Sequence, residues 1–271
     1  MLSAHGRIDA VTTANPPYRL ALLDLDGTLT DSAPGILSSV RYAYTTLGIE
    51  TPTDETLRRF VGPPLTETFA RHGVPVDRVA EAVAAYREVY AAGGMLDNSL
   101  YPGILECLTA ARAAGVRLAV ATSKPEVYAR RITAHFGIDA LVEGVYGATL
   151  DGSRGSKADV IEHALASLGA SEGAAGTTAT VGSEDDEVPG AGAGGAGRAG
   201  GAGRAVLDGL PPREEIIMVG DREHDVLGAA AHGIRCLGVS WGYAVPGELE
   251  DAGALAVVES TDELARMLRG E

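Results

Sequence analysis

The sequence predicts an α/β fold: a doubly wound, Rossmann-like parallel sheet with a helical domain inserted into it. Three observations predict this fold. Short apolar runs alternate with segments of helical periodicity, as in a parallel sheet covered by helices. The apolar runs are continuous rather than alternating, which is typical of strands buried on both faces. After the first run comes a long stretch of helical periodicity alone, which indicates a second, helical domain.

The first predicted strand is "RLALLD", in a core segment of residues 18–32. Residues 1–17 are expected to form a flexible tail, because "MLSAHGRIDAVTTANPP" contains no apolar signal core. Residues 33–99 contain the helical pieces "GILSSVRYAYTTLG", "DETLRRFVG", "PLTETFARHG" and "DRVAEAVAAYREVYAAGG". Each piece closes with glycine, which commonly ends a helix in the left-handed conformation. We therefore expect a compact helical insert.

Alternation of strands and helices resumes over residues 100–169 and 207–271. The first of these segments has a helix "ILECLTAARAAG", a strand "VRLAVAT", a helix beginning near Pro125, a short strand near "EGVYG" and a helix "SKADVIEHALASLG". The second has a strand "EIIMVGD", a helix "HDVLGAAAHG", a strand "IRCLGVS" and a last strand and helix in "LAVVESTDELARMLR". Right-handed crossovers between such strands give a parallel sheet.

Residues 170–206 do not fit this pattern. All residues from Gly190 to Ala205 are Gly or Ala except two arginines. Such a tract lacks the side chains that would offset the entropy cost of ordering its backbone. We therefore predict a disordered insertion, and a neutral expansion is a simpler explanation of it than a binding role.

Composition limits the range of partners. The net charge of −15 would repel a nucleic acid polymer or an anionic membrane surface, so neither is an expected partner. No run approaches the roughly 20 apolar residues of a membrane span.

The cysteines, Cys107 and Cys236, lack metal-binding spacing and are expected to be reduced and buried, as in a cytoplasmic protein. A monomer and a homodimer both remain open.

Two carboxylates, Asp24 and Asp26, follow the first strand, and Gly27 comes next. In an open parallel sheet the carboxyl ends of the strands line the ligand crevice. Residues two apart on extended backbone point the same way, so both carboxylates can face one spot. Two adjacent like charges need a cation or a shared proton, and Mg²⁺ prefers oxygen ligands of this kind. The pair therefore predicts a magnesium site that could screen an incoming phosphate.

Three further segments bring polar groups to strand ends or helix starts. Thr122 ends a strand, and its hydroxyl with the N–H of Ser123 could hold a phosphate oxygen. Lys157 begins a helix and would supply a positive charge. Asp221 and Asp225 follow a third strand as a second acid pair. Both lysines of the chain lie in these segments, although 22 residues are Lys or Arg.

Taken in order, "DLDGT", "ATSK", "SKADVI" and "GDREHD" resemble the four motifs of the haloacid-dehalogenase-like hydrolase superfamily. The resemblance covers the chain except for the tail and the Gly/Ala-rich insertion. With "FVGPPL" in the helical insert and "GVSWGY" near the end, the chain is similar to the phosphoglycolate phosphatase and bacterial 5′-nucleotidase-like branch, and the nucleotidase-like pattern is closer. Ala244 departs from the glycine that is frequent after "WGY".

The resemblance implies a Mg²⁺-dependent phosphate monoester hydrolase acting on a small phosphorylated metabolite. Asp24 would attack phosphorus and form an aspartyl-phosphate, while Asp26 would act as acid and then as base. Asp24, the Asp26 backbone carbonyl and Asp221 would bind Mg²⁺, with Asp225 acting through water or as an orienting group. The phosphoryl group would be bound by Thr122, Lys157 and the N–H groups near Leu25, Gly27 and Ser123.

The resemblance also implies that residues 33–99 form an inserted helical cap domain that closes over the site and selects the leaving group. Its candidate substrate-facing loop contains Gly62, Pro63 and Pro64. The absence of lysine from this insert argues against Schiff-base phosphonatase chemistry, and Asp26 argues against dehalogenation. Nucleoside monophosphate, phosphoglycolate and a general phosphate ester remain open as substrates.

Other interpretations remain beside hydrolysis. A β-phosphoglucomutase-like phosphotransferase would use the same four motifs, and a non-catalytic phosphate-binding protein is a further alternative. Lys124 and Arg222 could steer phosphate or simply be solvated. Trp241 and Tyr243 are expected to pack rather than to recognise a ligand.

Overall fold

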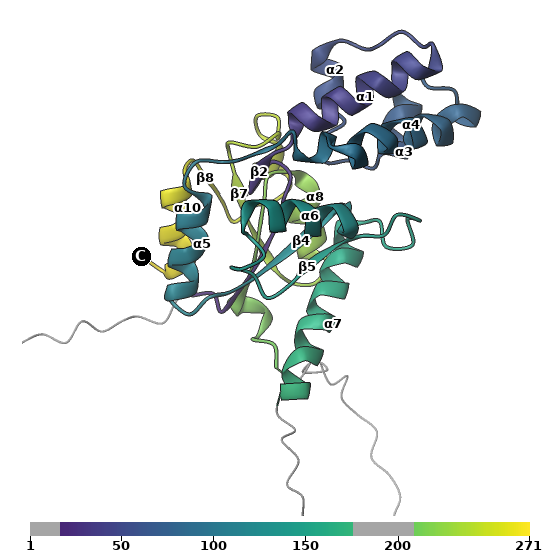
Figure 1. Cartoon of the computed structure of the whole chain (residues 1–271). Coiled ribbons are helices and arrows are strands. Elements are labelled where there is room, and N and C mark those ends of the chain that lie inside the picture. The colour runs from purple at the N-terminus through teal and green to yellow at the C-terminus, as the bar shows by residue number, and fades with distance from the viewer. Residues whose placement is uncertain (1–16, 176–208) are drawn as a thin grey trace, which may run out of the picture. The chain divides into compact units, whose positions relative to one another are not determined.

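The structure is a computed structural model that describes residues 17–175 and 209–271 (Figure 1). Almost all of the predicted tail and most of the predicted insertion lie outside these residues, so both remain predictions. Within the described residues, every helix is too short or too polar to span a lipid bilayer.

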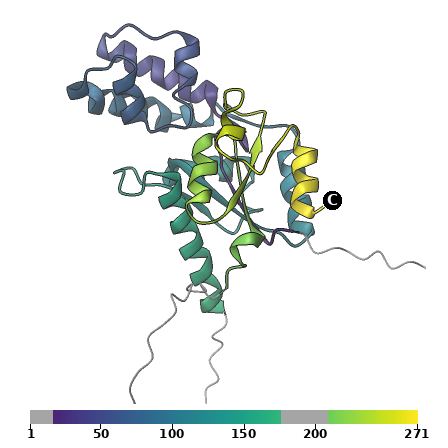
Figure 2. The ribbon, with the colours of Figure 1, turned by 180° about the vertical axis from the view of Figure 1, so that it is seen from behind.

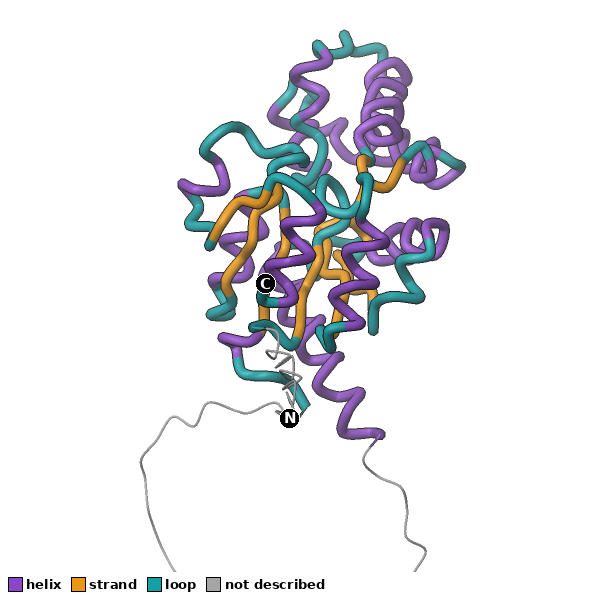
Figure 3. Tube along the Cα trace, turned by 90° about the vertical axis from the view of Figure 1, so that its left-hand side faces the viewer, coloured by secondary structure: helices purple, strands orange, loops and turns teal. Residues whose placement is uncertain are grey.

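A six-stranded parallel sheet forms the core, which confirms the predicted fold class. The order across the sheet is β5-β4-β1-β6-β7-β8. Their bounds are Leu20–Leu23 (β1), Arg117–Pro125 (β4), Val145–Ala148 (β5), Ile216–Gly220 (β6), Arg235–Val239 (β7) and Ala256–Val258 (β8). All residues of the central strands β1 and β6 are buried, because helices cover both faces of the sheet (Figure 3). This burial explains their continuous apolar sequences.

The direction in which the chain adds strands to the sheet changes beside β1. The chain runs from β1 to β4 and β5 on one side, then crosses to β6, β7 and β8 on the other. Right-handed crossovers therefore place the helices that follow β1 and β4 on one face of the sheet and the helices that follow β5 and β6 on the other, and Figures 1 and 2 view the ribbon from opposite sides. The helices are α5 (Ile104–Ala113), α6 (Glu126–Phe136), α7 (Lys157–Ala175), α8 (Glu223–Ala230), α9 (Glu248–Asp251) and α10 (Thr261–Arg269). Ligand crevices form at such a reversal, outside the carboxyl ends of the strands.

The helix α7 is longer than predicted. It continues to Ala175, into the segment 170–206 that was expected to be disordered. The added residues, "ASEGAA", contain mainly Ala and Glu besides one Gly and one Ser, and Ala and Glu have high helix propensity. Their composition therefore continues the helix instead of ending it at Gly169.

The inserted segment folds into four helices with their own apolar interior. The helices are α1 (Ala33–Leu47), α2 (Asp54–Arg58), α3 (Leu65–Arg71) and α4 (Val79–Ala92). Tyr44, Phe60 and Phe69 are buried together, and the ring centroids of the two phenylalanines lie 5.1 Å apart. Gly48 ends α1 with a left-handed φ of 66°, as its sequence position predicts.

A small antiparallel ribbon connects the helical insert to the core. It pairs β2 (Thr30–Asp31) with β3 (Ser99–Leu100), so both crossings of the chain lie side by side. Because β2 follows the loop after β1 directly, the insert begins within a few residues of Asp24 and Asp26. The ribbon therefore places any movement of the insert close to these acids.

Candidate active site

The loop after β1 wraps around one backbone carbonyl. The N–H groups of Thr28, Leu29 and Thr30 all approach the carbonyl oxygen of Leu25, at 3.0 to 3.3 Å. Asp24 extends the strand, and its N–H donates to Val219 of β6 at 2.9 Å. This tight loop holds the two predicted acids at the carboxyl edge of the sheet.

Glycines make room for the acids that face this loop. A Cβ atom on Gly27, which has a left-handed φ of 84°, would lie 2.1 Å from Asp221 Oδ2. A Cβ on Gly242 would lie 2.3 Å from Asp221 Cβ, and one on Gly220 would lie 2.2 Å from Asp225 Cγ. Side chains at these positions would displace the carboxylates, so these glycines are required by close approach.

Asp24, Asp221 and Asp225 form a buried carboxylate cluster, each offering an oxygen atom within 4.8 Å of the others. Burial raises the pKa of Asp221 well above its usual range, and the charges of Asp225 and Asp24 raise it further. Burial also raises the pKa of Asp225. The raised pKa values mean that this buried cluster holds its full negative charge only with difficulty unless a cation compensates it.

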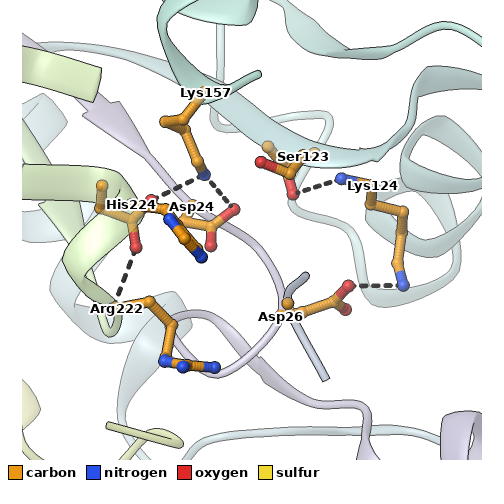
Figure 4. A pocket seen from close by; sticks show the side chains of 10 residues that line it. Asp24, Asp26, Ser123, Lys124, Lys157, Arg222 and His224 are labelled. Atoms are coloured by element: carbon orange, nitrogen blue, oxygen red, sulfur yellow. Dashed lines mark hydrogen bonds and ion pairs between the residues drawn. The ribbon is translucent and has the colours of Figure 1, made fainter. Parts of the chain in front are cut away.

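Lys157 lies between two members of the carboxylate cluster (Figure 4). Its Nζ is 2.8 Å from Asp24 Oδ1 and 2.7 Å from Asp225 Oδ1, and it donates to the carbonyl of Ala121 at 3.1 Å. Burial by itself would lower the pKa of Lys157, but the two carboxylates outweigh this effect and raise it. The alkyl chain of Lys157 packs against Gly228, where an added Cβ atom would lie only 2.7 Å from Lys157 Cγ.

The donor set of the carboxylate cluster fits a hard divalent cation. All its side-chain ligands are carboxylate oxygens, and one ammonium compensates only part of three neighbouring carboxylates. Asp221 is held by hydrogen bonds from Thr28 Oγ1 at 3.3 Å and from Tyr243 N at 2.8 Å. Such outer contacts orient metal-binding carboxylates. The residues present therefore suit Mg²⁺, which prefers oxygen ligands.

Thr122 and Ser123 lie at the carboxyl end of β4, which pairs with β1. Thr122 is buried, and its Oγ1 accepts a hydrogen bond from Lys124 N at 3.2 Å. The pairing of β4 with β5 shifts register between Thr122 and Pro125. This irregularity exposes the backbone and side chain of Ser123 toward the pocket.

A single pocket collects most of the predicted site residues (Figure 4). Its lining consists of Asp24, Asp26, Gly62, Thr122, Ser123, Lys124, Lys157, Arg222, His224 and Asp225. Gly62 belongs to the inserted helical segment, whereas Pro63 and Pro64 of the same predicted loop are not part of the lining. Gly27 and Asp221 are also outside the lining, although both are in contact with the cluster behind it.

Two basic residues have more specific contacts than the sequence indicated. Lys124 is buried, with its Nζ 2.6 Å from Asp26 Oδ2. Arg222 donates from Nη1 to the Val61 carbonyl of the insert at 3.1 Å and from Nε to Glu248 at 2.7 Å. The rarity of lysine was a signal for Lys124, but the Arg222 contact joins residues 161 apart and leaves no local sequence signal.

Trp241 and Tyr243 do more than fill space. Trp241 Nε1 donates to the Thr28 carbonyl at 3.1 Å, so it holds the loop after β1. The Tyr243 hydroxyl donates to Asp31 Oδ1 at 2.7 Å and accepts from Ala33 N at 3.0 Å. Both residues pack against the core, as expected, and their polar atoms in addition bind the loop after β1 and the connecting ribbon.

Family models match this arrangement over most of the chain. Residues 21–191 match the haloacid dehalogenase-like hydrolase model, and residues 198–264 match a HAD-hydrolase-like model. The chain belongs to the haloacid dehalogenase-like hydrolase family. The resemblance seen in its four motifs is thereby confirmed, and the chain is a hydrolase of this family.

Several relatives in this family have activities in their names. The chain is 41% identical to "Tyrosine-protein kinase PtkA" of Mycobacterium tuberculosis, over 92% of this chain and 72% of that protein. It is 37% identical to "5′-nucleotidase" of Pseudomonas aeruginosa, over 86% of this chain and 87% of that protein. A predicted phosphatase from Clostridium acetobutylicum is similar in structure, with a TM-score of 0.74 and 32% identity, over 94% of this chain and 99% of that one.

Proposed function

We propose that this hydrolase cleaves small phosphate monoesters in a Mg²⁺-dependent reaction with Asp24 as the nucleophile. The observation that carries the proposal is the grouping of Asp24, Asp26, Thr122 and Lys157 around one pocket beside a carboxylate cluster. A nucleophile, a separate proton donor and a cationic phosphate ligand are the groups that phosphoryl transfer through a covalent intermediate requires.

In the first step, an Asp24 oxygen attacks phosphorus, and the bond from phosphorus to the leaving oxygen breaks. The leaving oxygen keeps the bonding electrons and takes the proton of Asp26. In the second step, ionised Asp26 takes a proton from water as the water oxygen attacks the aspartyl-phosphate. The bond from phosphorus to Asp24 then breaks, and inorganic phosphate leaves.

Lys157 and Thr122 would hold the phosphoryl group during both steps. The Lys157 ammonium, buried between Asp24 and Asp225, is a fixed positive charge in a site of low dielectric. Asp24, the Asp26 backbone carbonyl, Asp221 and Asp225 are the proposed Mg²⁺ site. When bound, the ion would neutralise the phosphoryl oxygens and orient them for attack.

The pocket lining favours a small, polar leaving group. It contains no aromatic or large apolar side chain among the described residues, whereas Lys124, Arg222 and His224 border it. A nucleobase would need an apolar or aromatic surface on which to stack. We therefore place phosphoglycolate-like esters before nucleoside monophosphates as substrates, although a relative is named 5′-nucleotidase.

Phosphoryl transfer to a protein tyrosine is the second candidate, because a relative 41% identical is named a tyrosine-protein kinase. The same aspartyl-phosphate could pass to a phenol instead of water, with ATP as donor. Incubation with γ-labelled ATP and a tyrosine-containing peptide distinguishes the two candidates: a kinase transfers the label to the peptide, whereas a phosphate monoester hydrolase leaves the peptide unlabelled.

The test of hydrolysis is phosphate release from a substrate panel. We expect turnover of p-nitrophenyl phosphate and 2-phosphoglycolate with Mg²⁺, and loss of turnover with EDTA. Asp24→Asn should reduce kcat by at least about 10³-fold, since it removes the nucleophile. The matched control is Asp54→Asn, which changes an exposed carboxylate of the insert paired with Arg41 and should keep wild-type rates. Unchanged hydrolysis by Asp24→Asn would contradict the assignment.

A further inference from the structure

Lys124 links the proposed acid to the helical insert. Its Nζ lies 2.6 Å from Asp26 Oδ2 (Figure 4). The same Nζ donates to the Tyr90 hydroxyl at 2.6 Å. The Lys124 side chain is about as buried as that of Asp26. Lys157, the other lysine, reaches Asp24 instead, so each of the two lysines contacts one of the two loop acids.

Tyr90 belongs to α4 of the insert, and two other aromatic rings fix its position. Its ring stacks on Tyr86 with a centroid distance of 5.1 Å and meets Tyr128 edge-on at 5.5 Å. Burial raises the pKa of Tyr90 well above its usual range, so the hydroxyl stays neutral and can accept from the ammonium. The ammonium also lies 5.0 Å from the Tyr90 ring centroid, a favourable cation–π distance.

The contact leaves one Asp26 oxygen for chemistry. Asp26 Oδ2 faces Lys124, whereas Oδ1 is buried and has no hydrogen-bond partner within the described residues. A buried polar atom without a partner is costly unless a ligand or water completes it. Asp26 lines the pocket that would hold the leaving group, and Oδ1 is its oxygen without a partner, so Oδ1 is the oxygen available for proton transfer.

We propose that Lys124 is a positioning residue for Asp26 and that Tyr90 is the residue of the insert that holds Lys124 in place. The inference rests on the proposed role of Asp26 as acid and base. With Lys124 on Oδ2, Oδ1 faces the reacting group. When the insert moves away, Lys124 loses the Tyr90 hydroxyl, and the Asp26 carboxylate loses its fixed direction. Proton transfer is thereby tied to closure of the insert.

The dependence of rate on the leaving group tests this role. An alkyl phosphate needs a proton from the enzyme, whereas 2,4-dinitrophenyl phosphate has a good leaving group that needs none. We expect Lys124→Met to lower kcat/KM for the alkyl phosphate about 100-fold and for the dinitrophenyl ester less than about threefold. Tyr90→Phe should give the same pattern, with about a tenfold loss on the alkyl phosphate.

Tyr86→Phe is the matched control, because it removes a hydroxyl from the neighbouring stacked ring, whereas the hydrogen bond to Lys124 is made by Tyr90. It should behave as wild type on both esters. Circular dichroism of each variant checks that the chain folds. In an Asp26→Asn background, Lys124→Met should have no further effect on the alkyl phosphate, because the group that it positions is already absent.

The outcomes separate the inference from the proposed function. Equal losses on both esters would show that Lys124 acts on phosphate binding or on the fold, and they would overturn the positioning role. Wild-type rates for Lys124→Met on both esters would also overturn it. A wild-type enzyme that cleaves neither ester would instead contradict the proposed hydrolase function, whatever the variants do.

Discussion

The buried charges of the site stabilise the protein only as a group. Lys157 is held between Asp24 and Asp225, and Asp221 lies in the same cluster. Removing one member of a buried ion pair typically costs about 3–5 kcal/mol, because its partner remains charged and unsolvated. Such an arrangement is weak evidence for stability. It suits the proposed binding of a phosphate dianion and a metal ion.

Gly27 is the position where the backbone and the site constrain the residue type most clearly. Gly27→Ala would strain a left-handed φ and push a Cβ into Asp221 Oδ2. We expect a loss of about 2–4 kcal/mol in the free energy of unfolding, measured by urea denaturation, with loss of phosphatase activity.

Gly48→Ala provides the comparison for this prediction. Gly48 also has a positive φ, of 66°, but a Cβ there would meet no atom within 4 Å. Gly48→Ala should lower the free energy of unfolding by only about 1 kcal/mol and leave kcat unchanged. Equal effects of the two substitutions would show that backbone strain, and not contact with Asp221, explains the need for Gly27.

Strand β4 and helix α8 each supply several site groups from consecutive residues. β4 contributes Thr122, Ser123 and Lys124 at its irregular end. At the start of α8, Asp225 Oδ2 accepts from Arg222 N at 3.1 Å, while its other oxygen faces Lys157. One carboxylate therefore caps a helix and joins the cluster, so the start of α8 is fixed relative to the pocket.

The connecting ribbon should depend on Tyr243. Its hydroxyl bonds Asp31 and Ala33, while its backbone N–H bonds Asp221. Tyr243→Phe keeps the ring and removes only the hydroxyl, so we expect a local loss of about 1 kcal/mol. Hydrogen exchange at the Ala33 amide should then rise about fivefold.

Tyr42→Phe is the control for this measurement, because Tyr42 is an exposed residue of α1. It should leave exchange at Ala33 unchanged. A Tyr243→Phe protein with wild-type exchange at Ala33 would show that the ribbon does not depend on this hydroxyl.

The insert and the sheet domain meet through donors from several elements. Arg222 reaches the Val61 carbonyl, Lys124 reaches Tyr90, and Arg87 of α4 reaches the Leu150 carbonyl at 3.1 Å. These polar contacts lie beside an apolar one, since Tyr90 of α4 also packs edge-on against Tyr128 of α6. The polar contacts can exchange for water at low cost, which suits the proposed opening of the insert for substrate.

The reactivity of the two cysteine thiols measures whether the core is folded. Burial raises the pKa of Cys107 to about 12 and that of Cys236 well above its usual range. Since the thiolate is the reactive form, a raised pKa leaves little of it at pH 8. We expect no reaction with a thiol reagent such as Ellman's reagent in the folded state, and reaction of both thiols in urea. Rapid labelling of the folded protein would contradict this burial.

Local sequence was sufficient to predict where the acids lie and that the sheet is parallel. Asp24, Asp26 and Asp221 stand at strand ends, and the carboxyl ends of parallel strands share one edge, so their convergence follows from topology. It was insufficient for contacts between distant segments. The Lys124 contact with Tyr90 spans 34 residues, and the Tyr243 contact with Asp31 spans 212. No periodicity or motif encodes which of many polar atoms will meet across such distances.

The linear pattern of apolar runs, glycines and motif acids was enough to predict the parallel sheet, the inserted helices and the meeting of the acids at the strand ends. These features depend on neighbours in the chain. The pairing of Lys124 with Asp26, the support from Tyr90 and the binding of the ribbon by Tyr243 emerged only in the folded chain. Burial removes water from these polar groups, and each must then find the nearest partner that packing provides.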